Sequence, residues 1–183
     1  MTAQMTELVA HVAKGRARVA AAVAGLTEAQ ANFRTAPGEW SIVDNVEHLV
    51  LAEHSGLMKI WQAVDAMRAG NPYIGEHTNL GLPIEEVIRR TWKDRELAPP
   101  IATPRLGGAL GYWLAALDAC QPVLEKVSDH LGDLDPETVI FPHYLSGPLD
   151  ARQRVAFLRF HIDRHVLQIE TIRKRAVALA ANA

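Results

Sequence analysis

Two histidines near the C-terminal end of the chain stand four residues apart, His161 and His165. Residues at this spacing lie one above the other on a helix, so both imidazoles point the same way. On a helical wheel they fall within the apolar arc of Leu158, Ile162 and Ile169, and therefore face the protein interior. Because a neutral imidazole nitrogen binds divalent metals such as Zn²⁺ or Ni²⁺, the pair predicts half of a metal site. Two histidines with only core-edge hydrogen bonds are the alternative.

The same spacing occurs in the His-Glu-x-x-His metalloproteases, but Ile162 occupies the position of their glutamate, which argues against that class. A third ligand must come from another helix, and His48 is the best candidate. Small side chains at Asn45, Ala52 and Ser55 leave room beside its ring. We expect the histidines without partner spacing to be structural, to pack locally or to face solvent: His11, His54, His77 and His130.

Apolar residues recur at helical spacing in four long segments, over residues of about 6–26, 41–70, 109–131 and 148–176. Ser41 is a good N-cap for the second, and Asp44 adds negative charge to its first turn. Pro122 should kink the third segment or begin a new turn. No segment alternates with period two, so we expect no sheet. The sequence predicts one all-α domain over residues 1–183, a four-helix bundle with a long crossover, residues 70–108, between helices two and three. A short helix from Ile84 to Lys93 fits inside this crossover.

Composition narrows the classes of partner. The 183 residues carry a formal net charge of −2, and no basic stripe indicates nucleic acid as a partner. No apolar stretch of about 18 residues is present to span a membrane. The single cysteine, Cys120, cannot form an intramolecular disulfide, which fits a reducing compartment, so we expect a cytoplasmic protein.

Three stretches resemble the DinB-like superfamily. Residues 37–53, PGEWSIVDNVEHLVLAE, resemble its second-helix signature, in which a Trp-Ser start leads to a His-Leu pair. Residues 157–169, FLRFHIDRHVLQI, resemble its closing H-x-x-x-H-x-x-Q-I helix. Residues 142–149, PHYLSGPL, resemble the His-Pro-x-x-Gly-x-Leu approach to that helix, with Pro142 and His143 in reversed order, which leaves the role of His143 open. Together the motifs span most of the chain.

The resemblance implies a four-helix bundle in which His48, His161 and His165 bind a divalent metal ion, usually zinc or nickel. It further implies a metal-dependent S-transferase or isomerase that uses a low-molecular-weight thiol of the mycothiol or bacillithiol type and acts on a small-molecule substrate. Three protein ligands leave one position open, as in catalytic zinc sites, where a thiol or water loses its proton near neutral pH.

Three further residues are candidates for supporting this site. Asp44 could accept the outer N–H of His48, or serve only as a helix cap. Gln168 could donate to a substrate, or bond across the bundle. Arg154 could bind a carboxylate, or form a surface ion pair. Apart from these three, Glu53 falls inside an apolar arc, and could be buried with a partner or act as a base.

Two alternatives stay open beside thiol transfer. The chain could be a metal-binding stress-response or interaction protein without turnover, or a metal-dependent hydrolase with water at the open position. A homodimer through an exposed helix face is a further expectation, with three tryptophans as anchors or, alternatively, as core residues: Trp61, Trp92 and Trp113.

Overall fold

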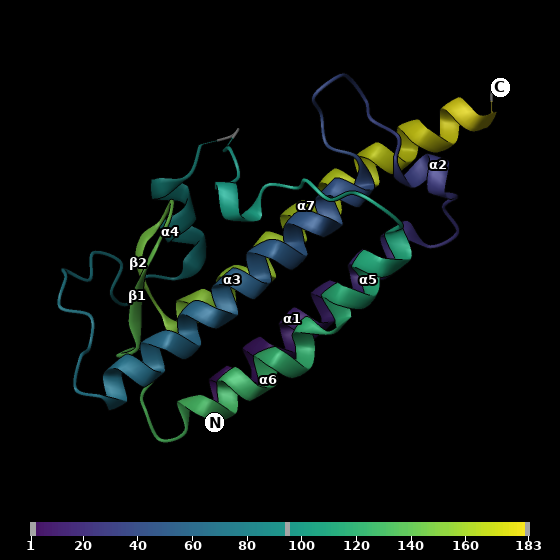
Figure 1. The fold of residues 1–183 in the computed structure, drawn as a ribbon. Helices are drawn as coiled ribbons and strands as arrows, with labels where there is room; N and C mark the ends of the chain where they lie inside the picture. The colour runs from purple at the N-terminus through teal and green to yellow at the C-terminus, as the bar shows by residue number, and fades with distance from the viewer. Residues whose placement is uncertain (1–2, 94–95, 182–183) are drawn as a thin grey trace.

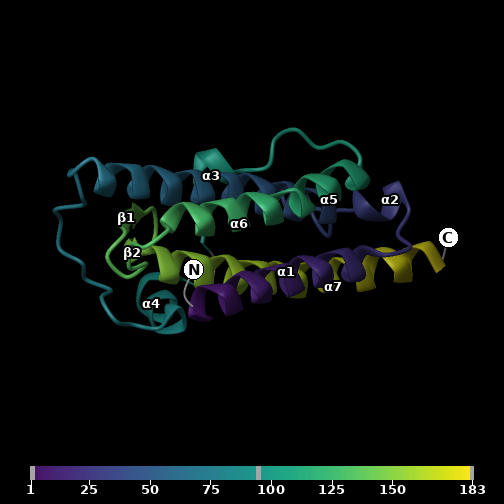
Figure 2. The same cartoon turned by 90° about the horizontal axis from the view of Figure 1, so that it is seen from below.

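Four helical columns make up the body of the computed structural model, which describes residues 3–93 and 96–181 (Figure 1). The columns are α1 (Ala3–Val23), α3 (Ile42–Arg68), α5 (Leu110–Asp118) continued by α6 (Cys120–Leu131), and α7 (Ala151–Ala181). α1 and α7 run in one direction and form one layer, while α3 and α5–α6 run in the opposite direction in the other (Figure 2). The all-α class is confirmed. A short helix that the sequence patterns did not reveal, α2 (Glu28–Ala31), follows α1.

The two helices that carry the histidines both begin at a capping box. The Ser41 hydroxyl accepts the Asp44 N–H, and the Asp44 carboxylate accepts the Ser41 N–H at 2.6 Å. Asp150 and Gln153 make the same reciprocal pair of bonds where α7 begins. Such boxes satisfy N–H groups that have no partner within the helix. They therefore fix the residue at which each helix starts, and with it the face that each histidine occupies.

The third column is broken near Pro122, as predicted. α5 ends at Asp118 and α6 begins at Cys120, which places Pro122 in the first turn of α6. A proline is tolerated there because the first N–H groups of a helix have no carbonyl partner. Across the bundle α1 lies close to α7, since a Cβ on Gly15 would come within 3.1 Å of Ile162.

A small β-hairpin precedes α7, so the expectation that the chain has no sheet is wrong at this point. β1 (Ile140–His143) pairs antiparallel with β2 (Gly147–Asp150), and Pro142 lies opposite Pro148. Each strand has only four residues, too few to display an alternation over several positions. The turn is closed by Gly147, whose φ of 71° lies in the left-handed region that glycine adopts without strain. The hairpin is an addition to the all-α bundle.

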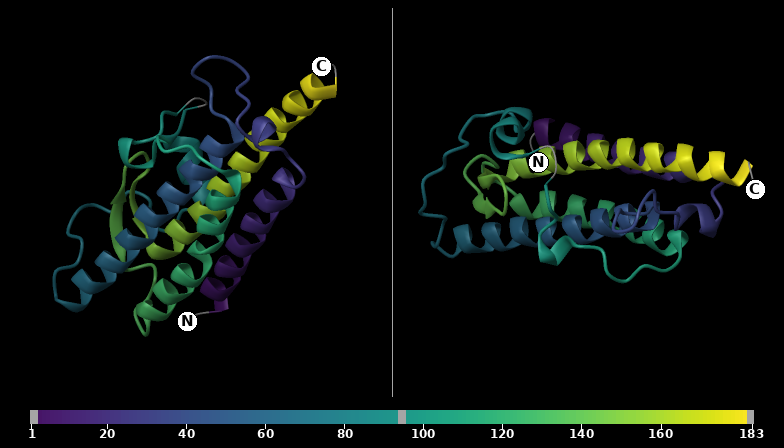
Figure 3. Two further views of the ribbon diagram at one scale, coloured as in Figure 1. Left: turned by 45° about the vertical axis from the view of Figure 1, so that its right-hand side comes forward. Right: turned by 90° about the horizontal axis from the view of Figure 1, so that it is seen from above.

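The long connection between α3 and α5 folds over one side of the bundle (Figure 3). It contains α4 (Ile84–Thr91), which confirms the expected short helix, and a 3₁₀ turn, η1 (Pro100–Ala102). α4 packs against Leu149 and Phe157 of the hairpin and α7. Asn79 ties the connection to the hairpin by donating to the carbonyls of Ser146 and Pro148. Two residues of the predicted crossover, 94–95, lie outside the described part.

The buried apolar core runs the length of the bundle and includes residues of all four columns, among them Val12, Leu49, Leu124 and Ile162. Within the described residues, no helix combines the length and apolar character needed to cross a membrane.

Candidate metal centre

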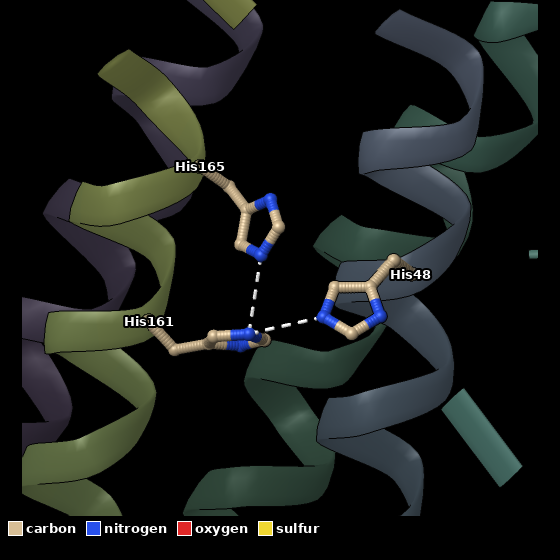
Figure 4. A group of neighbouring side chains, drawn as sticks. All are labelled: His48, His161 and His165. Atoms are coloured by element: carbon tan, nitrogen blue, oxygen red, sulfur yellow. Dashed lines mark hydrogen bonds between the residues drawn. The ribbon is translucent and has the colours of Figure 1, made fainter. Parts of the chain in front are cut away.

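Three imidazoles meet between α3 and α7, and their ring nitrogens point toward one another (Figure 4). His48 comes from α3, and His161 and His165 from consecutive turns of α7. Nε2 of His161 lies 3.0 Å from Nε2 of His48 and 3.2 Å from Nε2 of His165. Each of the three residues is only 5% exposed. The structure thus brings together the three histidines that the sequence predicts as metal ligands.

The outer nitrogen of His48 is held by the long connection. Its Nδ1–H donates to the carbonyl of Ala102 in η1, at 2.7 Å. The next residue on α3 toward its start, Glu47, is fully buried and accepts the N–H groups of Arg105, Leu106 and Gly107. Glu47 thereby anchors the segment that presents the carbonyl. With the proton of His48 on Nδ1, the lone pair of Nε2 faces the other two histidines.

The outer nitrogen of His165 is held by α3. Its Nδ1–H donates to Oδ1 of Asn45 at 2.8 Å. The amide nitrogen of Asn45 donates to the carbonyl of Ser41, which leaves its oxygen free to face the imidazole. His165 is therefore also protonated on Nδ1, with the lone pair of Nε2 directed at the same point as that of His48.

Such an arrangement suits a cation at the centre. Nε2 of His48 and Nε2 of His165 are both acceptors, and a proton on Nε2 of His161 could point at only one of them. Metal–nitrogen bonds of about 2.0–2.1 Å at tetrahedral angles place ligand nitrogens about 3.3 Å apart. The observed separations of 3.0 and 3.2 Å come close to this value. Outer nitrogens bonded to a carbonyl and an amide oxygen are also typical of metal-bound histidines.

Burial keeps these imidazoles neutral. It lowers the pKa of His48, and the hydrogen bond to Ala102 opposes this effect only in part. Burial also lowers the pKa of His161 and His165 well below the usual value, and the positive charges that neighbouring groups can carry lower it further. Neutral imidazole is the form that binds metal, so the site is prepared for a metal ion at neutral pH.

Aromatic rings surround the triad. Trp40, just before α3, lies 4.9 Å from His48 and 6.2 Å from His165 between ring centroids. Phe157, one turn before His161, stacks on that imidazole at 5.3 Å. These rings restrict the imidazoles to one orientation and limit the access of water to them.

The three predicted supporting residues have different surroundings. Asp44 caps α3 and pairs with Arg34 at 2.6 Å, while the outer nitrogen of His48 is bonded to Ala102 instead. Gln168 is exposed on α7. Arg154 is buried, at 6% exposure, and its guanidinium lies over the ring of Phe157. A surface ion pair, the alternative considered for Arg154, is therefore excluded.

Two other polar residues considered from the sequence are buried fully or in part. Glu53 is fully buried and paired with Arg16 of α1, which is the structural alternative for this residue. Burial, followed by the charge of Arg154, lowers the pKa of His143 to about 3. Nδ1 of His143 accepts the N–H of Ser146, so this imidazole shapes the hairpin.

The three tryptophans considered as dimer anchors differ in exposure. Trp113 is buried and donates to the carbonyl of Gly107. Trp92 is half-buried and donates to Ser146. Trp61 is 39% exposed and stacks on His130. Only Trp61 thus remains available as a surface anchor among the three.

The sequence did not reveal the partners of the outer nitrogens. The Ala102 carbonyl belongs to the backbone, and no side-chain pattern identifies it. Asn45 is expected beside His48, but its bond to His165 was missed, although a polar side chain on a buried helix face is a signal for such a contact.

Comparison with known families agrees with this geometry. A family model described as the DinB superfamily matches residues 11–169, a range that includes all three histidines. No curated protein and no solved structure matches the chain.

Proposed function

Because the chain belongs to the DinB superfamily and buries three histidines that could hold a metal ion, we propose that it is a metal-dependent thiol S-transferase. The observation that carries the proposal is the convergence of three Nε2 atoms, two of which have their lone pairs fixed by hydrogen bonds at the outer nitrogen. The proposed ligands are His48, His161 and His165, and Zn²⁺ or Ni²⁺ is the proposed metal.

A divalent metal bound by three imidazoles retains a position for an exogenous ligand and lowers the pKa of a thiol there, which supplies a thiolate near neutral pH. The protein's own residues do the positioning. Ala102 and Asn45 orient the imidazoles, and Trp40 and Phe157 pack around them. In the proposed transfer a sulfur–carbon bond forms, the leaving group departs with the electron pair of its bond to carbon, and the thiol proton passes to solvent.

The proposed thiol is a low-molecular-weight cofactor of the mycothiol or bacillithiol type, and the acceptor is a small electrophile. A thiol requirement separates transfer from hydrolysis, because water would replace the thiol in a hydrolase.

The test is a turnover assay with the zinc- and nickel-loaded full chain, a panel of low-molecular-weight thiols, and a chromogenic aryl halide as electrophile. We expect release of halide that requires both metal and thiol and that is lost in His161→Ala. Metal-dependent turnover without any thiol would replace transfer with hydrolysis. A stoichiometrically loaded protein with no turnover would leave only metal binding.

A further inference from the structure

Arg154 is a buried cation without a counter-ion in the part of the chain that the structure describes. Neither its Nε nor its Nη1 has a hydrogen-bond partner, and no ion pair among the described residues includes it. Burial lowers the pKa of Arg154 to about 10, so the guanidinium remains charged at neutral pH. The other buried arginine of the bundle, Arg16, pairs with Glu53 as expected of an interior charge. Arg154 thus lacks the partner that a buried guanidinium requires.

The surroundings of Arg154 cover its faces and leave its donors unused. The guanidinium carbon lies 4.8 Å from the ring centroid of Phe157 and 6.0 Å from that of Phe141. Aromatic faces attract a cation but do not replace hydrogen-bond acceptors in the guanidinium plane. On α3 the absence of a side chain at Gly56 makes room for the group, since a Cβ there would lie 2.6 Å from Nη2. Arginine N–H groups in this plane match the two oxygens of a carboxylate.

The guanidinium also lies on the same helix face as the metal ligands. Arg154 precedes His161 by seven residues, two turns or about 10 Å along the axis of α7. Phe157 lies between them in sequence and contacts both, under the guanidinium and stacked on the imidazole. The charge of Arg154 is close enough to lower the pKa of both His161 and His143.

We infer that Arg154 binds the carboxylate of a small organic acid whose other end reaches the histidine triad. This inference deepens the proposed function by naming the chemical class of the molecule bound, and its second half rests on that function. A carboxylate fits because its two oxygens match the N–H groups of one planar guanidinium, whose Nε and Nη1 have no partner among the described residues. A small molecule fits because a side chain that is 6% exposed leaves no surface for a macromolecule.

The test uses the zinc-loaded full chain and isothermal titration with hexanoate and with hexanamide, its neutral counterpart. We expect hexanoate to bind at least tenfold more tightly, and Arg154→Met to abolish the difference. Arg152→Met is the matched control, because Arg152 lies on the same helix but pairs with Glu137. It should keep the preference. Equal affinities in the wild type, an unchanged preference in Arg154→Met, or no binding of either compound would overturn the inference.

A second readout separates binding from a structural role. Removing an uncompensated buried charge should leave Arg154→Met at least as resistant to urea as the wild type, whereas a structural arginine would make the variant less stable. Should Arg154→Met fail to fold, Gly56→Ala decides the matter. Its Cβ would displace the guanidinium without removing the charge, so we expect a weakened preference for hexanoate. A full preference in Gly56→Ala would contradict the inference.

The outcomes also distinguish this inference from the proposed function. Hexanoate carries no thiol, so its failure to bind leaves thiol transfer standing. If the metal-loaded protein prefers hexanoate but transfers no thiol, the carboxylate site is supported and the proposed transferase activity is contradicted. Metal content should be the same in Arg154→Met and in the wild type, because Arg154 is not one of the proposed metal ligands.

Discussion

At the scale of single residues, the outer nitrogens of the histidines decide how the triad presents itself. Asn45 orients His165 through one hydrogen bond and is itself oriented by the Ser41 carbonyl. Ala102 does the same for His48 from the backbone. His161 differs, since its Nδ1 is buried without a hydrogen-bond partner in the described part of the chain. His161 is therefore held by stacking on Phe157 and by the contacts of its Nε2 with His48 and His165.

Replacing Asn45 tests whether the hydrogen bonds at the outer nitrogens orient the histidines. We expect Asn45→Ala to weaken zinc affinity by about 10- to 100-fold, because His165 loses the acceptor that fixes its tautomer and orientation. Competition with a chromogenic chelator measures the change. Ser41→Ala is the control, since it removes the helix cap and lowers stability by about 1 kcal/mol without removing a partner of His165. Equal zinc affinity in Asn45→Ala and the wild type would show that the contact does not orient the ligand.

His143 makes the stability of the folded protein depend on pH, and the direction of this effect follows from its pKa. Burial, then the charge of Arg154, lowers its pKa in the folded protein to about 3, while the unfolded chain titrates near 6.5. The unfolded state therefore binds more protons between these values, and stability present above pH 6.5 is lost as pH falls. Between pH 7.5 and pH 5 this residue alone lowers the free energy of unfolding by about 2 kcal/mol. We expect His143→Gln to lose less stability than the wild type over this range in urea titrations. Parallel pH profiles would show that His143 does not titrate in this way.

At the scale of elements, the long connection acts as part of the site. Glu47 and His48 are neighbours on α3, and both bind the segment from Ala102 to Gly107. The carboxylate of Glu47 accepts hydrogen bonds from three backbone N–H groups of this segment. The Ala102 carbonyl of the same segment accepts the Nδ1–H of His48. A metal ion bound at the triad would therefore be coupled to the conformation of this segment.

Replacing Glu47 should loosen that segment. We expect Glu47→Ala to lower the free energy of unfolding by about 1–3 kcal/mol, because three backbone donors lose a charged acceptor. Limited proteolysis should then cut within residues 96–108 faster than in the wild type, and zinc should dissociate faster. Glu53→Ala, another buried glutamate of α3 but paired with Arg16, serves for comparison and should not expose the same residues. Unchanged cleavage in Glu47→Ala would show that Glu47 does not hold the connection against the site.

How far the sequence predicts these elements depends on whether a signal is local. The histidine positions follow from the four-residue spacing and the apolar arc, and the cap at Ser41 and the break at Pro122 follow from local chemistry. The β-hairpin does not, because its strands are short and Asn79, far away in sequence, supports it. The contact of Ala102 with His48 joins residues 54 apart through a backbone atom, which no residue type reveals.

At the scale of the whole molecule, the triad connects the two layers of the bundle. His48 belongs to the layer of α3, and His161 and His165 to the layer of α7 (Figure 2). A metal ion bound by all three would link elements more than 100 residues apart in sequence. Such an ion binds the folded chain and not the unfolded one, so it stabilises the fold in proportion to the logarithm of its concentration.

Removing the metal should therefore destabilise the entire bundle. At a free zinc concentration about 1,000 times the dissociation constant, the linkage amounts to about 4 kcal/mol. We expect excess chelator to lower the midpoint of thermal unfolding of the wild type by several degrees, and added zinc to restore it. His161→Ala should unfold at the same temperature with and without chelator. A wild-type midpoint that does not respond to chelator would separate the triad from folding stability.

If His48, His161 and His165 bind a divalent metal ion, the untagged protein should contain that ion, and mass spectrometry measures its metal content. Wild type should carry close to one zinc or nickel ion per chain, and His161→Ala should lose it. His54→Ala, which alters an exposed histidine of α3, should retain it. A wild-type protein that stays metal-free after incubation with zinc or nickel, or a His161→Ala variant that binds as much metal as the wild type, would show that the three histidines do not form a metal site.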